Sequence, residues 1–186
     1  MKLRIDLEKE YGIVLEGGGA RGAYQIGVWK ALRETGMKIK GVAGTSVGAL
    51  NGALICMDDL GKAEEIWGNM NYSTVFNVDD SMIGKLKKFG VRSMKVTDAA
   101  AEFKRVVSDR GLDISPLKKL LEDTVDEERI RRSPRDFCAA SVSVTDRREE
   151  DFDVKSAPPG TMKDMLMASA YFPGFKQEKI GGKTYL

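Results

Sequence analysis

The beginning of the chain alternates between short apolar runs and longer segments in which apolar residues recur every three or four positions. The runs at 11–16 (YGIVLE) and 39–43 end at glycines and are too short for helices, so they predict buried strands. The segments 22–35 and 47–57 have helical spacing. This order of strand, helix, strand, helix predicts parallel strands joined by helical crossovers, which is the α/β class.

The rest of the chain predicts further helices and a second group of strands. Ser115 and Pro116 predict a helix start, with the serine as N-cap and the proline at the first helical position. The expected elements are helices at 60–70, at 98–110, from 115 onward and at 161–170, strands at 136–144 and 151–155, and a hairpin of 175–180 with 183–186 around Gly181-Gly182.

A glycine-rich segment, GGGARG at 17–22, follows the first predicted strand and opens the first predicted helix. Its glycines let the backbone bring N–H groups close to an anion, either a phosphate or a tetrahedral oxyanion. A dinucleotide-binding site needs an acidic residue about 20 positions on, where this chain reads KIKGVAG, and the GK[ST] of a P-loop is absent. Arg21 opposes the helix dipole in the first turn, which indicates a function involving negative charge.

A second glycine-flanked turn, GTSVG, lies between the second predicted strand and the second predicted helix. In this context a serine sits on a sharp turn with its hydroxyl exposed, and Ser46 is the candidate nucleophile. Gly44 and Gly48 avoid steric conflict where the backbone is crowded. The N–H of Val47, directly after the serine, can stabilise an oxyanion.

The two turns leave the carboxyl ends of successive strands, so they are expected to converge on one point. Gly17, Gly18 and Gly19 would then form an oxyanion hole beside the Ser46 hydroxyl. The 186 residues include no histidine, which excludes a Ser-His-Asp triad. The base must therefore be a carboxylate or, as a second option, a lysine.

The composition bears on the binding partners and on the cellular location that can be expected. Thirty basic and 28 acidic residues leave a net charge of +2, which gives no argument for nucleic acid as a partner. The two cysteines, Cys56 and Cys138, are expected to be buried reduced thiols and not a disulfide. The sequence shows no secretory signal and no apolar run of about 18 residues. A cytoplasmic protein is expected. The basic amphipathic segment 82–89 is most simply a solvated helix face, and peripheral contact with the inner membrane surface or a lid is the alternative.

Three blocks of the sequence closely resemble the patatin-like phospholipase family: GGGARGAYQIGVWKAL, GTSVGALNGAL and ASAYFPGF at 168–175. The resemblance implies a three-layer α/β/α sandwich with a mainly parallel sheet, hydrolysis of acyl esters in phospholipids and related lipids, and a Ser-Asp dyad with no metal or other cofactor. Carried over by motif, Ser46 matches the nucleophile. The oxyanion loop matches Gly17, Gly18, Gly19 and Arg21, with Gly22 completing its motif.

The chain departs from the family pattern at its end. The family aspartate lies in an Asp-Gly-Gly or Asp-Gly-Ala motif after a strand like 182–186, and no Asp here precedes Gly. We therefore expect residues 1–186 to be the N-terminal part of a patatin-like domain, truncated before the catalytic aspartate and inactive by itself. Asp146, Asp151 and Asp153 lie in or near a charged turn and are expected to be solvated.

Three other functions stay open from the sequence. A non-catalytic lipid- or acyl-binding protein would keep the shape of the site without its base. An acyltransferase would pass the acyl group to an alcohol or thiol instead of water, and the nucleophile half alone does not separate it from a hydrolase. A nucleotide-binding module would use only the glycine loop.

Overall fold

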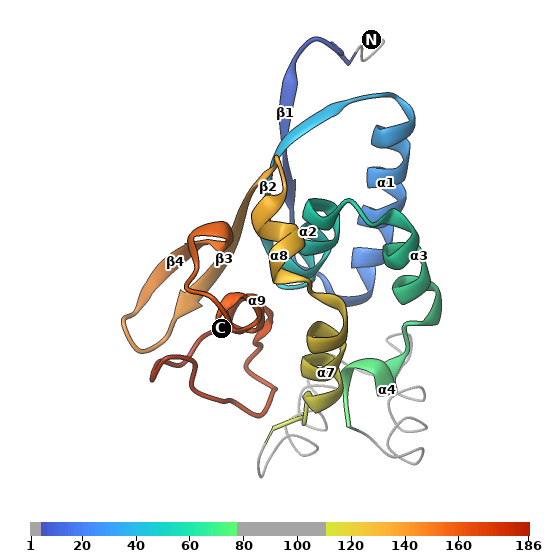
Figure 1. Ribbon diagram of the computed structural model, residues 1–186. Helices are drawn as coiled ribbons and strands as arrows, with labels where there is room; N and C mark the ends of the chain where they lie inside the picture. The colour runs from blue at the N-terminus through green and yellow to red at the C-terminus, as the bar shows by residue number, and fades with distance from the viewer. Residues whose placement is uncertain (1–4, 78–110) are drawn as a thin grey trace, which may run out of the picture.

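A computed structural model describes residues 5–77 and 111–186 of the chain (Figure 1). The predicted helix 98–110 and the basic segment 82–89 lie outside the described residues. In the described part, a four-stranded sheet has the order β1-β2-β3-β4. β1, β2 and β3 are parallel, and β4 returns antiparallel to β3. The strands are β1 (Glu10–Leu15), β2 (Lys38–Thr45), β3 (Asp136–Ser143) and β4 (Arg148–Asp153).

Seven α-helices and two short 3-10 turns are described alongside the sheet. The helices are α1 (Gly22–Glu34), α2 (Val47–Met57), α3 (Leu60–Asn69), α4 (Tyr72–Val75), α7 (Ser115–Thr124), α8 (Glu127–Arg132) and α9 (Met162–Ala170). The 3-10 turns are η1 (Gly19–Arg21) and η2 (Val154–Ser156). The α/β class and the mainly parallel sheet are therefore confirmed, with helical crossovers between the parallel strands.

The core is built around α2, which lies against β1, β2 and β3. Ten of its eleven residues are buried, because α1, α3 and α8 pack on its other sides. Small residues let it approach the sheet closely: a Cβ added at Gly52 would lie 2.6 Å from the ring of Phe137 on β3. α9 contacts β3 beside α2 and carries buried apolar side chains such as Leu166 into the same core.

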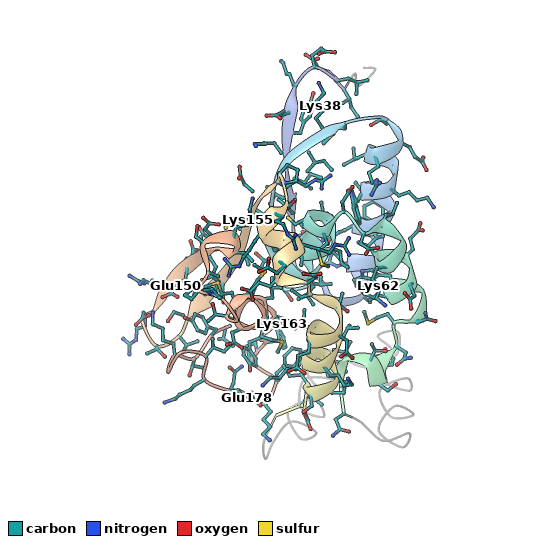
Figure 2. All side chains as sticks on the ribbon, in the orientation of Figure 1. Lys38, Lys62, Glu150, Lys155, Lys163 and Glu178 are labelled. Carbon is teal, nitrogen blue, oxygen red and sulfur yellow. The ribbon has the colours of Figure 1, made fainter. Side chains whose placement is uncertain are left out.

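α2 and α9, which contact the strands of the sheet, pack on the same face of it. Val42, Phe137 and Ala139 point into this helical layer and are at most 3 % exposed. On the opposite face Val14 is 84 % exposed and Val142 is 43 % exposed. Charged side chains are spread over the rest of the molecule, from Lys38 at one end to Glu178 at the other (Figure 2).

Two local expectations were wrong. Ser115 is the first residue of α7 and not its N-cap, because the carboxylate of Asp113 accepts the Ser115 N–H at 2.9 Å. The predicted C-terminal hairpin is reduced to a tight turn in which Ile180 and Lys183 exchange two backbone hydrogen bonds. The segment 184–186 pairs instead with the end of β3, where unpaired backbone groups were available.

Candidate active site

The glycine loop and the serine turn meet at the carboxyl ends of β1 and β2. Leu15 pairs with Gly44 in the parallel register, so the residues that follow them are neighbours. A Cβ added at Gly17 would lie 3.3 Å from the Ser46 Cβ and 3.5 Å from the Thr45 carbonyl oxygen. The expected convergence of the two turns is therefore present in the structure.

Ser46 occupies a backbone conformation that is rare for residues other than glycine, with φ 55° and ψ −127°. Such strain is retained where the surroundings force it, and it is found on the nucleophile turn between a strand and a helix. The surroundings here are tight. A Cβ at Gly44 would lie 2.4 Å from the backbone of Gly48, and a Cβ at Gly48 would lie 2.2 Å from the carbonyl oxygen of Leu15. Both positions require glycine.

The glycine loop passes into α1 through the turn η1. Gly19 has φ +55°, and the Arg21 side chain folds back over the loop, so that its Nε would lie 2.9 Å from a Cβ at Gly18. Gly22 is buried between Val47 and Trp67, which would lie 2.5 and 2.6 Å from an added Cβ. The loop is thus pressed against the first residue of α2, where helix amides have no intrahelical acceptor.

Asn51 connects the two halves of the site, and sequence reasoning missed it. Its side chain is 1 % exposed and its Nδ2 donates to the Gly22 carbonyl at 3.0 Å and to Gln25 Oε1 at 2.8 Å. Its Oδ1 accepts a hydrogen bond from Trp67 Nε1 at 2.8 Å. Gln25 in turn donates to the Glu16 carbonyl at 2.8 Å, directly before the glycine loop. The available signal was a lone amide within an otherwise apolar helix.

Ser169, at the end of α9, also contacts the turn that carries Ser46. Its Oγ accepts the backbone N–H of Ser46 at 2.9 Å and donates to the Ala140 carbonyl at 2.6 Å. The side chain is 3 % exposed. The sequence places this serine in an apolar segment, but only the fold brings it to Ser46, which lies 123 positions away along the chain.

Two carboxylates in or near the charged turn, those of Asp146 and Asp153, have partners of their own. Asp146 forms an ion pair with Lys183 and accepts a hydrogen bond from Ser143. The hydrogen bond from Lys183 is the main reason that the pKa of Asp146 is lowered. Asp153 caps η2, where it accepts the N–H of Lys155. Among the described residues, no carboxylate is hydrogen-bonded to the Ser46 hydroxyl.

The C-terminal segment runs toward the turn that carries Ser46. Leu186 and Val142 exchange two backbone hydrogen bonds of 2.9 Å, so the chain there lies antiparallel to β3. Its direction at Leu186 is from Val144 toward Ala140. Ala140 is the residue of β3 that pairs with Thr45, directly before Ser46.

No group of three or more Cys, Asp or Glu side chains is placed to hold a metal ion in the described ranges. No helix within those ranges is both long and apolar enough to cross a membrane.

An α/β sheet with a serine on a strand–turn–helix elbow, beside a glycine-rich turn, is the arrangement of α/β acyl hydrolases. A family model places the chain more closely: residues 13–186 match the model of the patatin-like phospholipases, and the chain belongs to that family.

Parts of the chain are also similar to larger relatives. Lysophospholipase nte1 of Aspergillus terreus is 45 % identical over 76 residues, which are 38 % of this chain and 5 % of that protein. Neuropathy target esterase sws of Drosophila sechellia is 34 % identical over 110 residues, 56 % of this chain and 7 % of that protein. The chain thus matches only a small part of each of these large relatives.

Among solved structures, VipD from Legionella pneumophila has a similar fold, with a TM-score of 0.59. The match covers 94 % of this chain and 44 % of VipD at 15 % sequence identity. This likeness concerns the fold alone.

Proposed function

We propose that this protein is a serine acyl hydrolase that cleaves carboxylic esters of phospholipids or lysophospholipids, with Ser46 as its nucleophile. The observation that carries the proposal is the contact between the two turns. Ser46 is half-buried on a strained backbone turn beside the glycine loop, and its Cβ lies 3.3 Å from the Cβ position of Gly17. Family membership supports a lipid ester as the substrate.

In the proposed reaction the Ser46 Oγ attacks the ester carbonyl carbon and its proton passes to a carboxylate. The tetrahedral oxyanion is held by amides of Gly17–Gly19 and by the Val47 N–H, while Arg21 supports the loop. As the C–O bond to the alcohol breaks, the protonated carboxyl group gives its proton to the leaving oxygen, so that a free alcohol and an acyl-serine remain. The regenerated carboxylate takes a proton from water as the water attacks this ester, and it passes that proton to the Ser46 Oγ when the fatty acid is released.

The carboxylate is proposed to come from residues that follow Leu186 in the complete protein, as in the family's Asp-Gly motif. The direction of the C-terminal segment supports this placement, because it runs along β3 toward the partner of Thr45. A direct Ser-Asp dyad also agrees with a chain that has no histidine.

The test is fatty-acid release from phosphatidylcholine and lysophosphatidylcholine vesicles by the complete protein. Ser46→Ala should lower the rate by more than about 10⁴-fold. Ser73→Ala, at an exposed serine on α4, is the matched control and should keep full activity. Equal fatty-acid release by Ser46→Ala and wild type would end the proposal. Transfer of the acyl group to added glycerol in preference to water would replace the hydrolase with an acyltransferase.

A further inference from the structure

We infer that Ser169 is a positioning residue for the nucleophile: its hydroxyl fixes the backbone turn from which the Ser46 side chain projects. This inference rests on the proposed function of Ser46. It begins from the place where β2 and β3 separate. Their parallel pairing ends at Thr45 and Ala140, and the chain then turns sharply at Ser46.

The Ser169 hydroxyl takes the place of the next backbone hydrogen bond between β2 and β3. Beyond the last pair, the Ser46 N–H and the Ala140 carbonyl no longer meet directly. The Ser169 Oγ lies between them, 2.9 Å from the nitrogen and 2.6 Å from the oxygen. The hydroxyl thus extends the connection between the strands by one step while the Ser46 backbone turns away.

The two hydrogen bonds of the Ser169 hydroxyl can each run in only one direction from donor to acceptor. A backbone N–H can only donate and a carbonyl can only accept, so Ser169 accepts from Ser46 and donates to Ala140. Its proton is therefore committed to Ala140. This buried serine is not available as a second nucleophile, although it lies beside Ser46.

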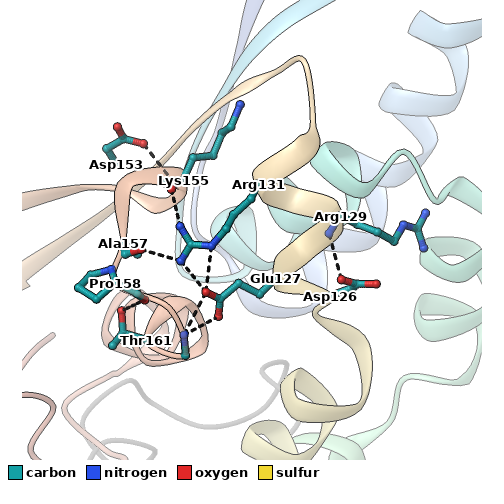
Figure 3. A network of polar contacts seen from close by, with 10 residues as sticks. Asp126, Glu127, Arg129, Arg131, Asp153, Lys155, Ala157, Pro158 and Thr161 are labelled. Atoms are coloured by element: carbon teal, nitrogen blue, oxygen red, sulfur yellow. Dashed lines mark hydrogen bonds and ion pairs between the residues drawn. The ribbon is translucent and has the colours of Figure 1, made fainter.

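α9 is held firmly enough to act as a fixed reference for the turn. Near its end, the Ser141 hydroxyl donates to the Ala168 carbonyl at 2.8 Å, one residue before Ser169. At its beginning, Glu127 of α8 accepts the Gly160 N–H at 3.0 Å. Arg131 contacts this Glu127 and donates to the Ala157 carbonyl at 2.6 Å (Figure 3). The helix is thus tied to β3 at one end and to α8 at the other.

Ser46 follows β2 directly, and its own backbone is strained because its φ is positive. The position of its hydroxyl therefore depends on contacts that hold this strained backbone in place. Loss of the Ser169 bond would leave the Ser46 N–H without its partner and allow the turn to relax. A displacement of about 1 Å in a reacting group can reduce a rate by about 100-fold. The loss should appear in kcat, since substrate contacts elsewhere are unchanged.

The experiment compares Ser169→Ala with Ser143→Ala in the complete protein, with a fatty-acid ester as substrate. Ser143 is the matched control because it is also buried, and its hydroxyl also donates once and accepts once, but only to Asp146 in the β3–β4 turn. Ser169→Ala should lower kcat about 10- to 100-fold with KM within about threefold, and Ser143→Ala should leave both near wild type.

Three further measurements separate positioning from general destabilisation. Ser169→Cys retains a weak donor and acceptor, so its kcat should fall between those of wild type and Ser169→Ala. Amide hydrogen exchange of the peptide containing Ser46 should be faster in Ser169→Ala, and unchanged in Ser143→Ala. Adding Ser169→Ala to Ser46→Ala should cause no further loss of activity.

The inference is overturned if Ser169→Ala and Ser143→Ala have the same kcat, or if the Ser46 peptide exchanges at the wild-type rate in both. Failure of the proposed function looks different. In that case Ser46→Ala itself retains activity, whatever the Ser169 variants do.

Discussion

Replacing Asn51 by alanine should destabilise the protein and loosen the glycine loop. The substitution removes three hydrogen bonds, to the Gly22 carbonyl, to Gln25 and from Trp67. A buried polar group left without a partner costs about 1–3 kcal/mol. Gln25 and Trp67 are partly exposed and can find water, whereas the buried Gly22 carbonyl would lose the hydrogen bond that it accepts from outside its own helix. We therefore expect the free energy of unfolding to fall by about 2–4 kcal/mol.

The assay is urea denaturation followed by tryptophan fluorescence, which reports on Trp67 together with the buried Trp29. Asn69→Ala is the control, because Asn69 is exposed and makes one hydrogen bond, to the Glu65 carbonyl. It should change the free energy of unfolding by less than about 0.5 kcal/mol. Ester hydrolysis should also fall in Asn51→Ala at temperatures where the variant is folded. A loss of stability below about 1 kcal/mol would refute the role given to Asn51.

Three further predictions concern backbone crowding, acid stability and thiol reactivity. Gly48→Ala should lower the free energy of unfolding by at least about 3 kcal/mol, measured by urea denaturation, because its Cβ would meet the carbonyl at the end of β1; a stable, active variant would contradict the geometry. Hydrogen bonds from Ser115 lower the pKa of Asp113 from 3.8 to about 2, so its stabilisation is complete above pH 3.8 and is lost as the pH falls toward 2. Asp113→Asn should therefore flatten the dependence of melting temperature on pH between about 4 and 2, and an unchanged slope would count against it. Burial raises the pKa of Cys56 to about 12, and also raises that of the half-buried Cys138. Iodoacetamide should modify Cys138 first and reach Cys56 only on unfolding, as mass spectrometry of the alkylated peptides would show; the reverse order would argue against this core.

The elements near the site could be predicted because their signals are local. The apolar run before Gly17 and the one before Gly44 became β1 and β2, and α2 begins at Val47 as expected. The C-terminal hairpin failed for the opposite reason. Its turn at Gly181-Gly182 is local and formed, but the partner of 184–186 is the end of β3, which no local pattern identifies.

The same distinction holds within the site. Ser46 and its flanking glycines have a recognisable spacing, because backbone crowding at a sharp turn leaves few choices of residue. Asn51 and Ser169 act through contacts with segments far along the chain, and a buried hydroxyl or amide has no spacing that names its partner. The partners of Asn51 and Ser169 become visible only once α3 has packed against α2, and α9 against β3.

The most direct test of the central claim is covalent labelling of the complete protein with a fluorophosphonate, followed by identification of the modified peptide. The account predicts one adduct, on Ser46 in the peptide that contains GTSVG, and no labelling of Ser46→Ala. An adduct on any other serine, or equal labelling of Ser46→Ala, would contradict it.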